Sequence, residues 1–319
     1  MPPPEQAGPT LISTDLLLAE VIGSTATLAQ IAATADPASQ VPTCPDWTLR
    51  QLITHVGRAH RWAAAIVATQ AAEPIPLREV PDGRLPDDPA ARPAWLRDGA
   101  ARLAGAVRAG GGPVWTHLGP GPASYWARRM AHETAVHRAD GQIAVGTRPA
   151  IDPVIAADGI AEWLGFLPAA RAAERPERPS PVPEGKVIHF HATDEGADGE
   201  WLIRGVPGGV TVAAGHGKGD MALRGPASAV LLVLMRRLPP GDPAVEVIGD
   251  RTLLDGWGEF FSGLILLCYT PAIQSLVRDW TVDADMGHGF FVPARCSVTS
   301  SGRSGRDSFN CRQEPTGED

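Results

Sequence analysis

The chain contains 319 residues, of which 44% are hydrophobic and 20% are charged. These proportions are ordinary for a globular protein, and the length suggests roughly two domains. The formal net charge of −8, without a visible basic stripe, argues against a nucleic-acid partner.

The N-terminus and the cysteines bear on where the protein works. Residues Met1–Glu5 lack the basic start of a signal peptide, and the apolar run Leu264–Tyr269 is too short to cross a bilayer. The cysteines at positions 44, 268, 296 and 311 show no paired ligand spacing and fit a reducing compartment better than a disulfide framework. We therefore expect a cytoplasmic protein with no membrane partner.

Helical periodicity marks five segments in the first half of the chain. They cover about residues 13–34, 48–69, 94–109, 122–145 and 153–167. Residues 41–47 and the proline-rich residues 74–93 are expected to be loops. The first four segments are the principal helices, and residues 153–167 add a further helical segment. Four helices connected by loops favour a helix bundle over residues 13–167.

The pattern changes in the second half. Residues 168–186 have the proline-rich composition of a semi-rigid linker. Short β-branched or aromatic runs then predict strands at residues 187–192, 201–204, 210–213 and 245–248. Apolar helices are expected at 227–238 and 253–261, which makes residues 187–261 a small α+β domain. Residues 262–319 form an extension that is expected to be disordered from about residue 295.

Three residues form the candidate site. Glu133 and His137 are four residues apart, so their side chains lie on one helix face together with Trp126 and Met130. Those two apolar residues suggest that this face is buried. His55, on another helix, would complete a set of two imidazoles and one carboxylate, as in catalytic zinc sites that keep a position open for water or substrate. The residues thus suggest a metal site.

Other interpretations of these residues stay open. A lone inward histidine such as His55 is more often a hydrogen-bonded core residue, and a single helical glutamate is more often solvated. His132 does not share a face with His137, so we assign it to the bundle or the surface. Asp140 either orients a ligand or lies in solvent at the helix end. Cys44 is assigned to structure.

Further charged and polar side chains have two interpretations each. Arg128, Arg129 and Arg138 either bind a carboxylated substrate or form a solvated face, and we favour the solvated face for at least two of them. His189 and His191 alternate on one face of a predicted strand and could form a polar patch. We assign both histidines to structure.

Two long segments and several short ones form a recognisable pattern. The long segments are residues 41–62, which begin Val-Pro-Thr-Cys-Pro-Asp-Trp, and residues 125–141, which contain His-Glu-Thr-Ala-Val-His. Shorter pieces follow in order at 158–163, 191–194, 200–202, 223–226 and 247–250. Together they resemble the mycothiol-dependent maleylpyruvate isomerase family over residues 13–261. The extension from residue 262 departs from the family pattern.

This resemblance carries expectations for fold and site. It implies a DinB-like four-helix bundle followed by a small sterol-carrier-protein-like α+β domain. It implies a divalent metal, usually zinc, at the positions matching His55, Glu133 and His137, with mycothiol as the thiol cosubstrate. It also associates an arginine with catalysis, and Arg237 is the best match. Alternatively, Arg236 and Arg237 only place positive charge at the end of a helix.

The implied reaction is a thiol-dependent isomerisation. A zinc ion can deprotonate a bound thiol, and the thiolate is the competent nucleophile. The thiolate adds to an activated cis double bond, the resulting single bond rotates, and elimination gives the trans alkene. A mycothiol S-transferase acting on a small electrophile would need the same activated sulfur. A non-catalytic metal-binding or regulatory protein is the alternative from another class.

Overall fold

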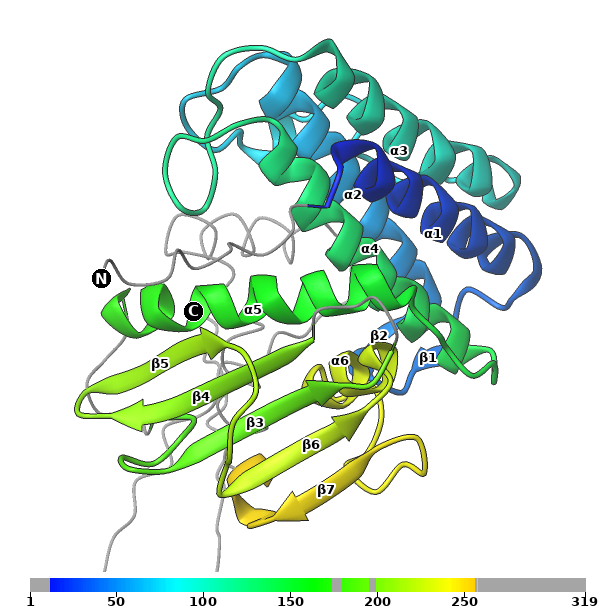
Figure 1. The fold of residues 1–319 in the computed structure, drawn as a ribbon. Helices are drawn as coiled ribbons and strands as arrows, with labels where there is room; N and C mark the ends of the chain where they lie inside the picture. Colours follow the sequence, from blue (N-terminus) through cyan, green and yellow to red (C-terminus); the bar gives the residue numbers. More distant parts are fainter. Residues whose placement is uncertain (1–11, 174–179, 195–198, 256, 258–319) are drawn as a thin grey trace, which may run out of the picture.

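The computed structural model describes residues 12–173, 180–194, 199–255 and 257 (Figure 1). The protein is α+β, with helices in the first half and a mixed sheet in the second. The extension predicted over residues 262–319 and most of the helix predicted at 253–261 lie outside the described residues.

Four long helices pack together in the first half. They are α1 (Thr14–Thr34), α2 (Leu49–Ala68), α3 (Arg92–Ala109) and α4 (Ser124–Ala144). Helix α1 packs against α3 and α4, and α2 packs against the same two helices. The loop predicted at residues 74–93 contains two short 3-10 helices, η1 (Leu77–Glu79) and η2 (Pro89–Ala91).

Capping explains where α1 and α2 begin and where α3 ends. The Ser13 hydroxyl accepts a hydrogen bond from the Leu16 N–H at 3.2 Å. Thr48 and Gln51 form a capping box, in which the Gln51 side chain accepts from the Thr48 N–H at 2.8 Å. Helix α3 ends at Gly110, whose φ of 70° is accessible to glycine without steric cost.

Helix α1 is long and apolar enough, by length and composition alone, to cross a membrane. Its Leu18, Val21 and Leu28 side chains are fully buried against the rest of the protein. A core helix that is buried inside a protein can have the same length and apolar composition as a helix that spans a membrane.

A short hairpin replaces the loop predicted at residues 41–47. Strand β1 (Gln40–Val41) pairs antiparallel with β2 (Cys44–Thr48), and the hairpin contacts α2 and α4. Its sequence lacks the alternation of a half-buried strand, and Pro45 lies within β2, which demotes a strand prediction. The hairpin holds Thr43 and Cys44 beside α4.

The second half contains a five-stranded sheet. Its strands are β3 (Val187–Ala192), β4 (Glu200–Val206), β5 (Gly209–Ala214), β6 (Met221–Gly225) and β7 (Glu246–Gly249). The order is β5-β4-β3-β6-β7, in which only the β3–β6 pair is parallel. Strand β6 was not predicted, because its run Met-Ala-Leu-Arg-Gly contains neither β-branched nor aromatic residues.

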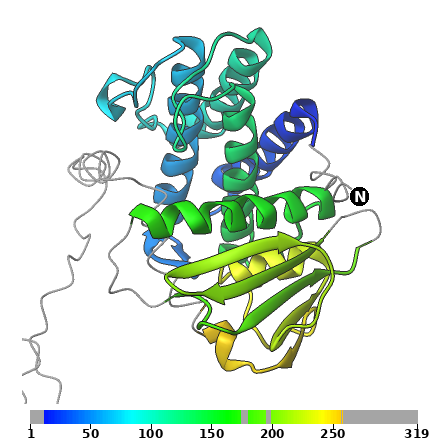
Figure 2. The ribbon, with the colours of Figure 1, turned by 60° about the vertical axis from the view of Figure 1, so that its left-hand side comes forward.

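Two helices lie on the sheet. Helix α5 (Pro153–Ala173) runs between the sheet and the helices of the first half, and it packs against α6 (Ala227–Leu234) (Figures 1 and 2). Helix α5 continues past its predicted end at residue 167, so residues 168–173 are helical and not part of the predicted linker. Helix α6 ends before the predicted residue 238.

The sheet has one covered face. Ile188 and Phe190 are fully buried in the core that includes α6. Because strand side chains alternate, His189 and His191 lie on the opposite face.

One buried histidine makes stability depend on pH. His60 on α2 is 1% exposed, and its Nε2 lies 2.8 Å from the Thr134 hydroxyl on α4. Burial, aided by the charge of Arg61, lowers the pKa of His60 to about 3. In the unfolded chain an ordinary histidine has a pKa of about 6.5. The unfolded state therefore binds a proton that the folded state excludes, and stability falls as the pH falls from about 6.5 toward 3.

We predict that His60→Gln reduces this acid sensitivity. The amide does not titrate, so between pH 7 and pH 5 the variant should lose about 2 kcal/mol less unfolding free energy than the wild type. Urea denaturation at the two pH values measures the difference. Equal losses in the two proteins would contradict the assignment of a neutral buried imidazole.

Candidate functional site

The structure brings the three predicted ligands together. His55 comes from α2, and Glu133 and His137 come from α4. The Nε2 atoms of both histidines lie 3.2 Å from the same oxygen, Glu133 Oε1. One ligand atom from each residue lies within 4.8 Å of the other two. The two imidazole rings meet edge to face, with centroids 4.8 Å apart.

The cluster is buried on the histidine side and open on the glutamate side. The His55 side chain is 4% exposed and the His137 side chain 11%, whereas the Glu133 side chain is 27% exposed. Burial lowers the pKa of His55, which favours the neutral imidazole that a metal requires.

Arg129 fixes the other carboxylate oxygen. Its Nη2 donates to Glu133 Oε2 at 3.1 Å, while its Nη1 binds Glu162 on α5. Burial alone would raise the pKa of Glu133, but the hydrogen bonds from His137 and His55 and the charge of Arg129 hold it well below its ordinary value. The carboxylate is therefore ionised and has a fixed orientation.

Asp140 orients His137, which agrees with the first of the two interpretations given above. Nδ1 of His137 lies 2.8 Å from Asp140 Oδ2, and Asp140 is fully buried. Although burial opposes protonation, the hydrogen bonds to Asp140 and Glu133 raise the pKa of His137 to about 9. At neutral pH the ring therefore holds a proton on each nitrogen, with Nδ1 directed at Asp140 and Nε2 at Glu133. A metal would have to displace the Nε2 proton, while Asp140 keeps the proton on Nδ1.

Arg237 reaches the site from the second half of the chain. Its Nε and Nη2 donate to the two oxygens of Asp140, each at 2.9 Å. The chain turns toward Asp140 because α6 ends in a Schellman motif, with the Arg237 N–H bonded to the Leu232 carbonyl at 2.7 Å and Arg236 at a φ of 62°. Arg237 thus contacts a residue that holds a predicted ligand, and the catalytic role expected for it stays a prediction.

The β1–β2 hairpin adds residues that the sequence did not indicate for this site. The Thr43 hydroxyl donates to Asp140 Oδ1 at 2.5 Å, and the Cys44 sulfur lies 3.7 Å from Asp140 Oδ2. Burial and the charge of Asp140 raise the pKa of Cys44 to about 12, so it is a thiol at neutral pH. The Trp47 ring lies 4.9 Å from His55 and 5.8 Å from His137, centroid to centroid.

His132 lies away from the three predicted ligands, and its place is in the bundle. It is 1% exposed, and its Nδ1 lies 2.8 Å from Glu162 Oε2 on α5. Its Nε2 lies 3.0 Å from Asp158, also on α5.

The three arginines of α4 do not form the solvated face that we favoured for at least two of them. Arg128 pairs with Asp158 at 2.8 Å, and Arg129 is buried between two carboxylates. Arg138 donates to the Ser24 hydroxyl at 2.8 Å. Periodicity alone could not reveal Asp158, Glu162 and Ser24 as partners, because these residues lie on α5 and α1.

The donor set fits a divalent transition metal. With ligand bonds of 2.0–2.2 Å, neighbouring ligand atoms around tetrahedral zinc are about 3.3–3.5 Å apart, close to the 3.2 Å separations found here. Cys44, His137 and Asp140 form a second, overlapping group. It suits a cation less well, because Arg237 already pairs with Asp140 and the thiol of Cys44 keeps its proton.

Comparison with known proteins gives two family matches. Residues 18–141 match the mycothiol maleylpyruvate isomerase N-terminal domain, and residues 154–256 match the corresponding C-terminal domain. Two solved structures, a crystal structure of the mycothiol-dependent maleylpyruvate isomerase and one of a histidine-to-alanine mutant, are each 17% identical, with a TM-score of 0.47, and cover 74% of this chain and 93% of that chain. No curated protein matches the chain. Through its two domain matches, the chain belongs to the mycothiol-dependent maleylpyruvate isomerase family.

Proposed function

We propose that the protein is a metal-dependent isomerase that uses mycothiol or a similar small thiol. The observation that carries this proposal is the convergence of His55 Nε2 and His137 Nε2 on one oxygen of Glu133. Family membership supports a thiol cosubstrate. Two imidazoles and a carboxylate leave a coordination position for a further ligand, as catalytic zinc sites do.

The side chains around this centre have distinct tasks. When bound, zinc would lower the pKa of a thiol ligand and so supply a thiolate at neutral pH. Arg129 keeps the Glu133 carboxylate ionised and oriented, and Asp140 keeps the His137 proton on Nδ1. The open side at Glu133 would admit the thiol and the substrate.

The proposed reaction needs no nucleophile from the protein, because the thiolate of the cosubstrate is regenerated. The thiolate sulfur adds to the activated cis double bond, the single bond rotates, and elimination returns the thiolate and the trans alkene. The Cys44 thiol is not needed, which agrees with its raised pKa. If the adduct were released instead of eliminated, the same site would act as a mycothiol S-transferase.

Two finer expectations belong to this proposal. We infer that residues 13–167 form a DinB-like four-helix bundle and that residues 187–261 form a sterol-carrier-protein-like domain. The packing of α1 and α2 against α3 and α4 supports the first expectation, and the mixed sheet with helices on one face supports the second. We also propose that the protein acts in the cytoplasm.

We predict that His55→Ala, Glu133→Ala and His137→Ala each lose one equivalent of bound zinc per chain. Removing a direct ligand should cost more affinity than the roughly 10–100-fold lost when an outer partner is removed. Elemental analysis after dialysis measures the loss, and circular dichroism checks the helix content. His132→Gln is the matched control on α4 and should keep its zinc. Full occupancy in the three alanine variants would overturn the ligand assignment.

We predict that the zinc-loaded protein converts maleylpyruvate to its trans isomer only when mycothiol is present. The activity should disappear in His55→Ala. Absorbance and chromatography of the product measure isomerisation, and mass spectrometry detects any thiol adduct. A stable adduct without isomer would favour the transferase. Zinc binding with neither product would favour a non-catalytic role.

We predict that Arg237→Lys weakens zinc binding at this centre about tenfold, because the ammonium cannot grip both oxygens of Asp140. Asp140 would then orient His137 less well. Arg236→Lys, the same change one residue earlier, is the control and should bind zinc as the wild type does. Zinc competition with a chromogenic chelator measures both affinities. Equal affinities in the two variants would remove Arg237 from the positioning role.

A further inference from the structure

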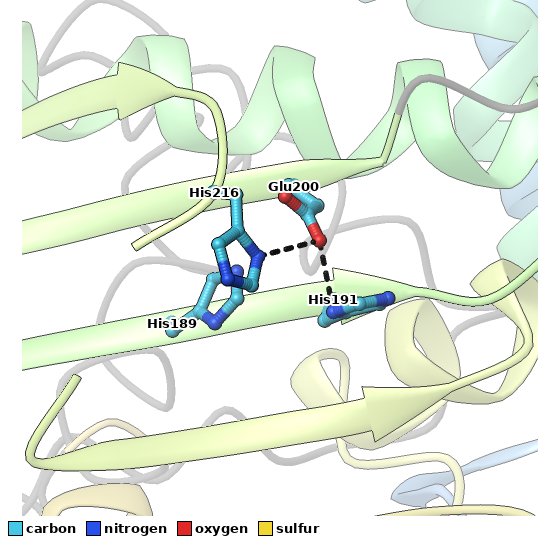
Figure 3. A group of neighbouring side chains, drawn as sticks. All are labelled: His189, His191, Glu200 and His216. Carbon is cyan, nitrogen blue, oxygen red and sulfur yellow. Dashed lines mark hydrogen bonds and ion pairs between the residues drawn. The ribbon is translucent and has the colours of Figure 1, made fainter. Parts of the chain in front are cut away.

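Another group of histidines lies on the face of the sheet opposite to Ile188 and Phe190. His189 and His191 come from β3, Glu200 begins β4, and His216 lies in the loop after β5 (Figure 3). One ligand atom from each of the four residues lies within 4.8 Å of the others. The Nδ1 atoms of His191 and His216 approach the same oxygen, Glu200 Oε1, at 2.9 and 3.1 Å.

Sheet register builds three of the four positions. His191 lies directly opposite Glu200 in the antiparallel β3–β4 pair, so their side chains are neighbours on one face. His189 lies two residues before His191 and therefore points to the same face. The register of the β3–β4 pair therefore fixes which residues are neighbours and on which face of the sheet they lie.

The loop that follows β5 holds the fourth residue over the strands. The Gly215 N–H donates to the Glu200 carbonyl at 2.8 Å, and Gly215 has a φ of 123°. A Cβ on Gly217 would lie 2.6 Å from the Leu202 side chain, and one on Gly219 would lie 2.6 Å from the Met221 carbonyl. The loop therefore runs close against the sheet, and at Gly219 a larger residue would collide with backbone. The Gly215–Glu200 backbone hydrogen bond brings the loop, and with it His216, beside Glu200.

His189 has a buried ring nitrogen that makes no hydrogen bond among the described residues. The residue is 5% exposed, and its Nε2 has no hydrogen-bond partner among the described residues. Its ring lies 5.6 Å from that of His191 and 5.4 Å from that of His216, centroid to centroid. Hydrogen bonding to Glu200 explains the positions of the other two histidines, but it does not satisfy the buried nitrogen of His189.

We propose that His189, His191, Glu200 and His216 form a second metal site that binds a divalent transition cation such as zinc. Three imidazoles and one carboxylate are donors for zinc, copper or nickel, whereas magnesium prefers an oxygen shell. Four donors from the protein would close a tetrahedral shell, so the bound cation would join β3, β4 and the loop. This site shares no residue with the centre on α2 and α4.

The test uses zinc alone, on the full-length untagged chain after chelator treatment. A His55→Ala background removes the other centre, so that failure of one site does not obscure the other. We expect calorimetry to find one zinc equivalent in this background. Adding His216→Ala should weaken that binding at least tenfold, because loss of a direct ligand exceeds loss of an outer partner. Magnesium should give no binding heat at this site.

Control variants separate metal binding from disturbance of the loop. The His216 side chain is 76% exposed, so its replacement leaves the core intact. Lys218→Ala changes an exposed residue of the same loop and should leave the zinc affinity unchanged. Zinc should raise the melting temperature of the His55→Ala protein but not of the His55→Ala/His216→Ala protein. No zinc binding by His55→Ala, or unchanged affinity in the double variant, would overturn the proposal.

Discussion

The buried carboxylate of Asp140 is the constraint on which the arrangement of the site depends. A charge with no exposed surface must be paired and hydrogen-bonded to be tolerated. Arg237 supplies the charge from the chain after α6, Thr43 supplies a hydroxyl from the hairpin, and His137 supplies an N–H from the same helix. Asp140 thus connects Arg237, from the second half of the chain, with His137, one of the candidate metal ligands on α4.

Paired charges also connect α4 with α5. Oppositely charged groups continue from Glu133 through Arg129 to Glu162, which also contacts His132. Breaking such a buried pair by removing one partner costs about 3–5 kcal/mol, because it leaves a charge uncompensated. The charged residues of α4 therefore have a structural task in fixing how α4 and α5 meet, and Glu133 takes part in both the network and the candidate site.

The sequence allowed the local features to be predicted but not the long-range ones. The spacing of Glu133 and His137 follows directly from the helix period, and the same periodicity predicted the bounds of α1, α2, α3 and α4 to within about two residues. The contact between Arg237 and Asp140 joins residues 97 positions apart and depends on a left-handed turn at Arg236, which no periodicity indicates. Likewise, the two strand histidines were visible, but Glu200 joins them only through strand register, and His216 only through the path of a glycine-rich loop.

The two clusters share a local arrangement, in which two imidazole nitrogens approach one carboxylate oxygen, and differ in what surrounds it. At Glu133 the second oxygen is held by Arg129 and His137 is held by Asp140, so two of the three donors are preorganised by partners outside the shell. Around a tetrahedral cation, the three donors of the helical centre would leave one coordination position open for a substrate. The four donors of the sheet cluster would occupy all four positions of their own cation. The helical centre is therefore suited to catalysis and the sheet cluster to a structural cation, although both draw on the same two side-chain types.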